Sequence, residues 1–167
     1  EHFRPDDPSA VVSEIQRFFQ SRIARLLADE GYAKDTIAAV TDLSIDHIPN
    51  VWERAAALHA LRSAADFEPL AVAFKRAVNI LRKAELEGRI PLDPSLFQDP
   101  AETNLFEAYT SVKDKVDHAL GSSDYPSALR TIATLRIPVD RFFDGVMVMA
   151  EDRQLRRNRL ALLQAIA

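Results

Sequence analysis

The chain has 167 residues, 47% of them hydrophobic and 28% charged, which is the balance of one folded domain with a sizeable core rather than of a disordered chain. Its formal net charge of −4 excludes a protein that coats nucleic acid indiscriminately, so any contact with RNA must be local. The lack of cysteine excludes disulfides, thiolate nucleophiles and cysteine-ligated zinc, and the lack of a long apolar run excludes a membrane-spanning helix.

The same features bear on the compartment and the extent of the chain. A chain without cysteine fits a reducing cytosol, and we therefore expect a cytoplasmic protein. The first residue is Glu1 rather than an initiating methionine, and no signal peptide follows it, so we expect a piece of a longer protein.

Three helices are predicted in the first third of the chain. Helical spacing of apolar residues and end signals predict helices over about residues 8–30, 34–43 and 49–63. Trp52 and His59 are seven residues apart and so share one face of the third helix. Core packing is favoured over base stacking for Trp52 and over a metal site for His59, because no second ligand is spaced near the histidine.

The fourth predicted helix, about Glu68 to Glu87, carries the candidate functional residues. Its predicted apolar stripe consists of Leu70, Phe74, Ala77, Val78 and Leu81. At about 100° per residue, a separate arc of roughly 120° collects four cations and one amide, which are Lys75, Arg76, Asn79, Arg82 and Lys83. A solvent-exposed basic stripe is the common alternative, but in this acidic chain the arc favours RNA, with cations on phosphates and the Asn79 amide on a base edge.

The second half of the chain predicts a long loop and four further helices. The proline-containing loop follows Gly88, and it is as compatible with a plain connector as with a binding element. Helices are predicted over about residues 101–120 and 125–136. A short helix then begins at Pro138, and a longer one follows a brief connector. The apolar face of the short helix is predicted to hold Val139, Phe142, Phe143, Val146 and Met147.

Arg159 stands out in the last predicted helix. Its position on the helical wheel lies among apolar residues, so we expect a half-buried guanidinium that needs a carboxylate partner. Asp140 and Asp144 on the preceding helix are the candidates, and we predict a structural ion pair between Arg159 and Asp144 rather than a phosphate contact.

The sequence contains no recognisable catalytic or metal-binding pattern. It has no glycine-rich phosphate loop, no H-E-x-x-H and no G-x-S-x-G, and its four histidines share no ligand spacing. We therefore predict no catalytic residue, no metal site and no membrane contact for this chain.

Three stretches resemble one protein family. The run PVDRFFDGVMVMAEDRQLRRNRLALL, residues 138–163, resembles the closing signature of the β subunit of the bacterial two-subunit-type glycyl-tRNA synthetase. FFQSRIARLLADEGYAKDTIAAV, residues 18–40, and FKRAVNIL, residues 74–81, agree with the same family. With the spacing between these stretches, the resemblance spans nearly all of the chain. The fourth predicted helix contains KRAVNIL, residues 75–81, which resembles the family's KR-x-x-NIL motif. This resemblance is a second reason to favour RNA contact for the basic arc.

The resemblance implies both a fold and a function. It implies an all-α, single-domain helical bundle over residues 1–167, with the DALR-like anticodon-binding fold, as a C-terminal fragment of a longer β subunit. The partners would be tRNA(Gly) and the α subunit of the parent hetero-oligomer. That enzyme uses ATP and Mg to attach glycine to tRNA, whereas this domain would hold no cofactor and would only position the RNA.

Two other functions remain open at this point. A structural helical module that docks against another subunit would expose a large apolar patch and would carry the basic arc incidentally. The anticodon-binding domain of an arginyl-type synthetase would share the broad helical class and would differ in the tRNA that it prefers.

Overall fold

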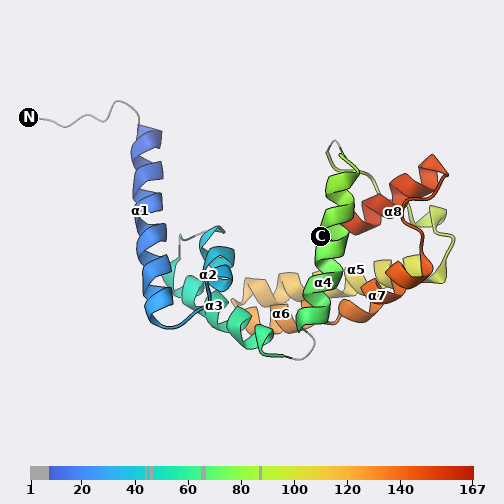
Figure 1. The fold of residues 1–167 in the computed structure, drawn as a ribbon. Helices are drawn as coiled ribbons and strands as arrows, with labels where there is room; N and C mark the ends of the chain where they lie inside the picture. Colours follow the sequence, from blue (N-terminus) through green and yellow to red (C-terminus); the bar gives the residue numbers. More distant parts are fainter. Residues whose placement is uncertain (1–7, 44, 46, 65–66, 87) are drawn as a thin grey trace, which may run out of the picture. The chain divides into compact units, whose positions relative to one another are not determined.

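The computed structural model describes residues 8–43, 45, 47–64, 67–86 and 88–167. In these residues the structure contains α-helices and one short 3-10 helix and no β-strand, which confirms the all-α class (Figure 1). The chain divides into two compact units, unit 1 over Glu1–Leu61 and unit 2 over Arg62–Ala167.

Unit 1 is built from three helices, α1 (Pro8–Asp29), α2 (Lys34–Thr41) and α3 (Ile48–Arg62), close to the predicted bounds. Trp52 packs against the core of this unit, as predicted, and its indole N–H donates to the Glu30 carboxylate, 3.0 Å from Oε1. The core consists of buried residues from all three helices, namely Ile23, Leu27, Ile37, Val40, Val51 and Ala55.

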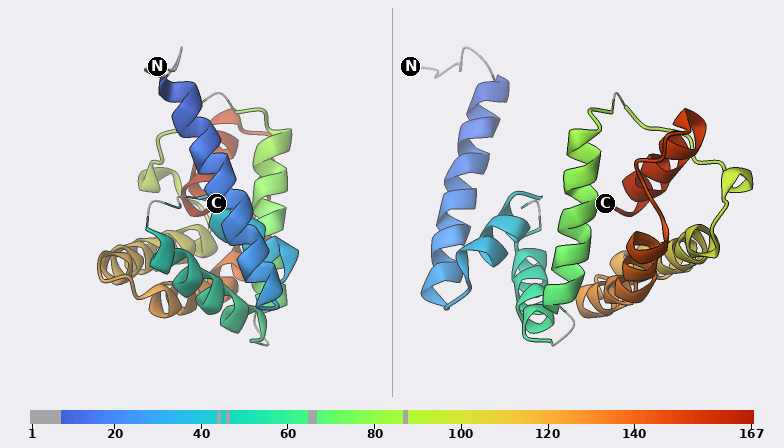
Figure 2. Two further views of the ribbon diagram at one scale, coloured as in Figure 1. Left: turned by 90° about the vertical axis from the view of Figure 1, so that its left-hand side faces the viewer. Right: turned by 45° about the vertical axis from the view of Figure 1, so that its right-hand side comes forward.

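Unit 2 contains five α-helices in its described residues. They are α4 (Phe67–Lys83), α5 (Pro100–Gly121), α6 (Tyr125–Ala133), α7 (Arg136–Gly145) and α8 (Arg153–Ile166), with the 3-10 helix η1 (Pro94–Leu96) before α5. Helix α5 packs against α6, α7 and α8, while α4 packs against α7 and α8, and the end of α8 lies beside α4 (Figures 1 and 2). The centre of the unit is filled by side chains without solvent exposure, which include Leu105, Val139, Phe142, Leu162 and Leu163.

Several predicted boundaries and faces need correction. Helix α4 ends at Lys83 rather than near Glu87, because Glu85 adopts a left-handed conformation with φ of +46° that a helix cannot continue. Val146 is extended rather than helical, since α7 ends at Gly145, and Met147 is 73% exposed. Val78 on α4 is also exposed rather than part of the apolar stripe.

The predicted ion pair of Arg159 has a different partner. Arg159 is only 8% exposed, and its Nε lies 3.0 Å from Oε1 of Glu102 on α5. Its Nη1 also donates to the backbone carbonyl of Met147 at 2.9 Å. Asp144 is exposed, and Asp140 pairs with Arg136 one helical turn away, so neither of the predicted carboxylates is the partner found.

Glu102 joins three segments of unit 2. Its Oε2 accepts the backbone N–H groups of Gln98 and Asp99, both at 2.9 Å, which forms a capping box at the start of α5. Burial raises the pKa of the Glu102 carboxyl, but the bonds from Arg159, Asp99 and Gln98 and the charge of Arg159 outweigh burial and hold the pKa below its usual value. Glu102 is therefore held as an anion in the core, and it fixes α5 to α8.

The loop before α5 is fastened to α8 by two amide side chains. Asn158 accepts the N–H of Asp93 through Oδ1 at 2.8 Å and donates to the carbonyl of Asp93 through Nδ2 at 2.9 Å. Gln164 accepts the N–H of Ile90 at 2.8 Å and donates to the carbonyl of Gly88 at 2.9 Å. These bonds satisfy the loop backbone where no secondary structure does so.

Candidate nucleic-acid interface

The outer face of α4 carries all five residues that the sequence singles out for RNA contact. Lys75, Arg76, Arg82 and Lys83 are exposed, and Asn79 is half-buried. All of these except Arg82 line a shallow hollow of about 370 Å³, together with Val72 and Ile80. The structure thus brings four of the predicted residues into one surface and places Arg82 beside Asn79.

Two contacts orient side chains on this face. Arg82 donates from Nη2 to Oδ1 of Asn79 at 3.2 Å, so the oxygen of Asn79 is occupied. For Nδ2 of Asn79 we find no partner among the described residues, which leaves its N–H groups as donors. The Arg76 guanidinium lies over the ring of Phe143 on α7, 4.3 Å from the ring centroid, and this cation–π contact holds the arginine against the bundle.

The charge of the α4 face is not neutralised by the carboxylates that the structure describes. In residues 67–86 and 88–167, the ion pairs found join Lys113 to Asp117, Arg136 to Asp140, and Arg159 to Glu102. None of them involves Lys75, Arg76, Arg82 or Lys83. The surface therefore presents positive charge to solvent from a chain whose net charge is negative.

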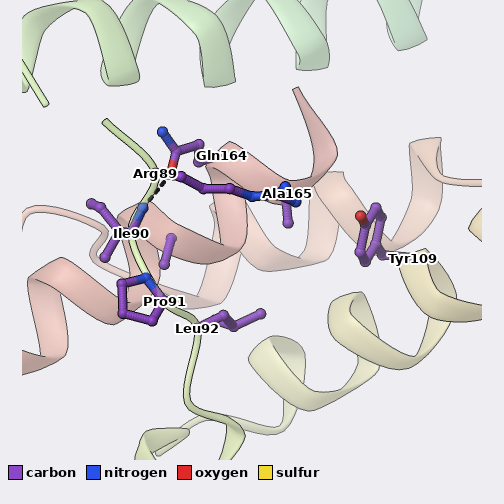
Figure 3. A pocket seen from close by; sticks show the side chains of 8 residues that line it. Arg89, Ile90, Pro91, Leu92, Tyr109, Gln164 and Ala165 are labelled. Atoms are coloured by element: carbon purple, nitrogen blue, oxygen red, sulfur yellow. Dashed lines mark hydrogen bonds between the residues drawn. The ribbon is translucent and has the colours of Figure 1, made fainter. Parts of the chain in front are cut away.

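A second hollow, of about 450 Å³, lies where the loop after α4 passes over α8 (Figure 3). Gln164 points toward the backbone of Ile90 and uses both ends of its amide to hold the loop. Arg89 and the Tyr109 ring of α5 also line this hollow. Because the amide that reaches the loop is already paired, we assign this hollow to loop fixation rather than to ligand binding.

Metal binding and membrane insertion find no support in the described part of the chain. No group of three or more His, Cys, Asp or Glu side chains is placed there to hold a metal ion. No helix in the same residues has both the length and the apolar character that a membrane crossing requires.

Sequence reasoning missed two residues that fasten α5 and the loop before it to α8. The sequence analysis assigns Glu102 no role, although Asp99 three residues earlier gives the D-x-x-E pattern of a capping box. The sequence gives no sign of the role of Asn158, because its hydrogen-bond partner Asp93 is 65 residues away in the chain.

Similarity to known proteins was found in a family model and in full-length relatives. The model of the DALR anticodon binding domain matches residues 70–167. The glycine–tRNA ligase beta subunit of Desulforapulum autotrophicum is 40% identical over 163 residues, which are 98% of this chain and 24% of that protein. The beta subunits of Desulfatibacillum aliphaticivorans and Nitrosomonas eutropha are 44% and 38% identical over 92% and 99% of this chain.

These matches cover nearly all of this chain but only part of each relative, and the family model covers the two units unequally. The chain spans only 22% to 24% of the length of these relatives. The family model covers most of unit 2 and none of unit 1, so a single anticodon-binding domain over residues 1–167 stays a prediction. Because the model matches more than half of the chain, we conclude that the chain belongs to the DALR anticodon binding domain family.

Proposed function

We propose that this chain is the anticodon-binding region of a glycyl-tRNA synthetase β subunit and that it positions tRNA(Gly) for aminoacylation. Support comes from the family match and from relatives of that name, which align with nearly the whole chain. The complete enzyme would act in the cytoplasm with an α subunit, ATP and Mg. This region would hold the RNA and leave the chemistry to other parts of the enzyme.

The α4 face is the proposed contact with the anticodon loop. Loop bases are unstacked, so one surface can neutralise phosphates and also form hydrogen bonds with base edges. Lys75, Arg76 and Lys83 would contact phosphates. Glycine anticodons end in two cytosines, whose carbonyl oxygens accept hydrogen bonds, and the free N–H groups of Asn79 match them. The observation that carries this proposal is a group of exposed cations without an ion pair to the described carboxylates.

The test is the salt dependence of tRNA binding by the intact ligase. Lys75→Ala, Arg76→Ala and Lys83→Ala should each weaken binding of tRNA(Gly) and lower the slope of log K against log salt by about one unit per lost phosphate contact. Lys115→Ala removes one exposed charge from α5 and serves as the control. If the three variants keep the slope of the control, the α4 face is not the phosphate contact.

One further variant on the same face separates base specificity from electrostatic attraction. Asn79→Ala should reduce the preference for the cytosine-containing anticodon and leave the salt slope unchanged, because it removes a neutral donor. Competition between glycine tRNA and arginine tRNA distinguishes the arginyl-type alternative. Tighter binding of arginine tRNA would favour that alternative over the proposed function.

A docking function for unit 1 is the second candidate, since a specific surface favours it. Helix α1 exposes large apolar side chains at fractions of 44% to 60%, namely Val12, Ile15, Phe18, Phe19 and Leu26. Ile15 and Phe19 also line a hollow of about 210 Å³ with Ile45 and Ile48. Because the relatives are about four times as long as this chain, we propose that α1 docks against another part of the same β subunit.

A further inference from the structure

A basic hollow of about 780 Å³ lies between the end of α4 and the start of α8. Four cations line it, Lys83 from α4 and Arg153, Arg156 and Arg157 from α8, against one carboxylate, Glu85. Lys83 also lines the hollow on the α4 face, so the two hollows adjoin at its side chain. The positive surface therefore continues from α4 onto α8.

The arginines of this hollow do not stabilise the helix that carries them. The first turn of α8 contains no acidic residue, and Arg153 and Arg156 stand close to the positive end of the helix dipole, where cations are unfavourable. Asp152 caps the helix by accepting the N–H groups of Gln154 and Leu155 through Oδ1. Helix stability thus gives no reason for the arginines, whereas binding of an anion does.

The same helix separates structural from available arginines. Arg159 turns inward to Glu102, whereas Arg153 and Arg157 are exposed. Arg156 is half-buried and reaches the carbonyl of Ala150 at 3.5 Å. Among the described residues, no carboxylate forms an ion pair with Arg153, Arg156 or Arg157. Their charges are thus available to an external anion.

One wall of the hollow is apolar. Met149, in the connector before α8, is 53% exposed, and Leu86 and Leu160 line the hollow with it. A free phosphate would use the arginines but not this wall. A nucleotide combines a negative phosphate with a flat base that packs on apolar side chains, and the volume is within the range of small-ligand sites, about 300–1,000 Å³.

We propose that this hollow binds one unstacked nucleotide of the tRNA loop, with its base against Met149 and Leu86 and its phosphate on Arg153 and Arg157. The proposal rests on the proposed function and extends it from α4 to α8. A strand that crosses the α4 face can continue into the hollow past Lys83, which lines both.

The first test removes the phosphate partners in the intact ligase. Arg153→Gln combined with Arg157→Gln should weaken binding of tRNA(Gly) about tenfold and lower the salt slope by about two, which is about one unit for each lost phosphate contact, as for the α4 variants. The control combines Arg130→Gln with Arg141→Gln, two exposed arginines of α6 and α7, and has the same net charge. Binding by the control should stay within about twofold of wild type, and equal losses in both double variants would overturn the proposal.

The second test concerns the base. Met149→Ala should weaken binding about threefold without a change in the salt slope, because the substitution removes apolar contact and no charge. Met149→Leu keeps the volume and should retain binding. Unchanged affinity of Met149→Ala would overturn the placement of the base. Two RNA ligands complete the design, a hairpin of the tRNA(Gly) anticodon arm and a loop-free RNA duplex with the same number of phosphates. If the variants lose equal affinity for both RNAs, the hollow does not bind a nucleotide of the loop.

The outcomes separate this proposal from the proposed function. If Lys75→Ala weakens tRNA binding and the Arg153, Arg157 double variant behaves like its control, the hollow is excluded and the α4 face stands. If only the double variant weakens binding, the hollow stands and the α4 face falls. Equal melting temperatures of the variants and wild type show that a loss does not come from unfolding.

Discussion

The two units differ in what they bury and in what they leave exposed. Unit 1 has a small apolar core, and the buried polar side chains in its described residues are Thr36 and Thr41, the latter bonded to a carbonyl of its own helix. Unit 2 buries the anion of Glu102, the cation of Arg159 and the amide of Asn158, each bonded to a different segment of that unit.

The surfaces of the two units differ as well. A buried ion pair costs desolvation and is tolerated when every group has a partner, which makes the arrangement of α5, α8 and the connector specific. Helix α8, whose start lines the larger basic hollow, is one of the elements that this network holds. The buried residues described in unit 1 include no charged side chain, and α1 exposes apolar side chains instead. We infer that unit 2 is built for recognition and unit 1 for docking.

The largest expected effect comes from breaking the buried pair of unit 2. Glu102→Gln should destabilise unit 2 by about 3–5 kcal/mol, because Arg159 is left buried without its anion. Asp144→Asn is a matched control, since Asp144 is exposed and should change stability by less than about 0.5 kcal/mol. Urea unfolding followed by circular dichroism measures both.

A second variant tests whether Glu102 and Arg159 are energetically coupled. Arg159→Met should destabilise by a similar amount, and the double variant should lose less than the sum of the two single variants, because the partners interact directly. Strict additivity would contradict a coupled pair. Equal effects of Glu102→Gln and Asp144→Asn would contradict the contact itself.

The matching perturbation of unit 1 is a cavity rather than a charge. Leu27→Ala should destabilise unit 1 by about 2–4 kcal/mol, because Leu27 has no solvent exposure. Leu26→Ala removes the same atoms from the neighbouring, half-exposed position and should cost less than about 1 kcal/mol. If the units are independent, Leu27→Ala leaves tRNA binding through unit 2 intact, and a parallel loss of binding would break the comparison.

Acid should destabilise unit 2 through Glu102. The pKa of the Glu102 carboxyl lies below that of an ordinary glutamate, so its contribution to stability is fully present above the unfolded-state pKa and is lost as pH falls through the folded-state pKa. We expect a smaller loss than that of Glu102→Gln at neutral pH. Urea unfolding at pH 7 and pH 3 measures it, and Glu102→Gln should lose less on acidification than wild type. Equal acid sensitivity of both proteins would contradict the direction of the pKa.

The sequence predicts the helices well where the apolar spacing and the end signals agree. The predicted bounds of α1 and α3 lie within one residue of the observed bounds, because proline and polar residues mark the starts of these helices. The spacing misleads about the end of α7, because Val146 and Met147 continue the apolar pattern after the chain has left the helix at Gly145. Val146 is still buried, as predicted, whereas Met147 is exposed. Periodicity shows which side chains share a face only while the helix persists.

The candidate site also has a part that the sequence predicts and a part that it does not. The cations of α4 are neighbours within one helix, so their common face can be predicted from 100° per residue. Burial of Arg159 was predictable from its wheel position, but its partner was not, because Glu102 is 57 residues away. Lys83, Arg153 and Arg157 line one hollow only because α4 packs on α8, which the sequence does not reveal. Sequence reasoning therefore identified the α4 part of the proposed RNA-binding surface and missed the α8 part.

The smallest expected effect on stability concerns the exposed face of α1. Phe18→Ser should change the stability of the 167-residue chain by less than about 0.5 kcal/mol, because Phe18 is 60% exposed there. In the intact β subunit the same variant should lower the melting temperature, since docking would bury the ring. Leu120→Ser on α5 is the control, an exposed apolar residue of unit 2 that should behave alike in both proteins. Hydrogen exchange of α1 provides an independent measurement, and equal protection in the short chain and the intact subunit would show that α1 docks nowhere.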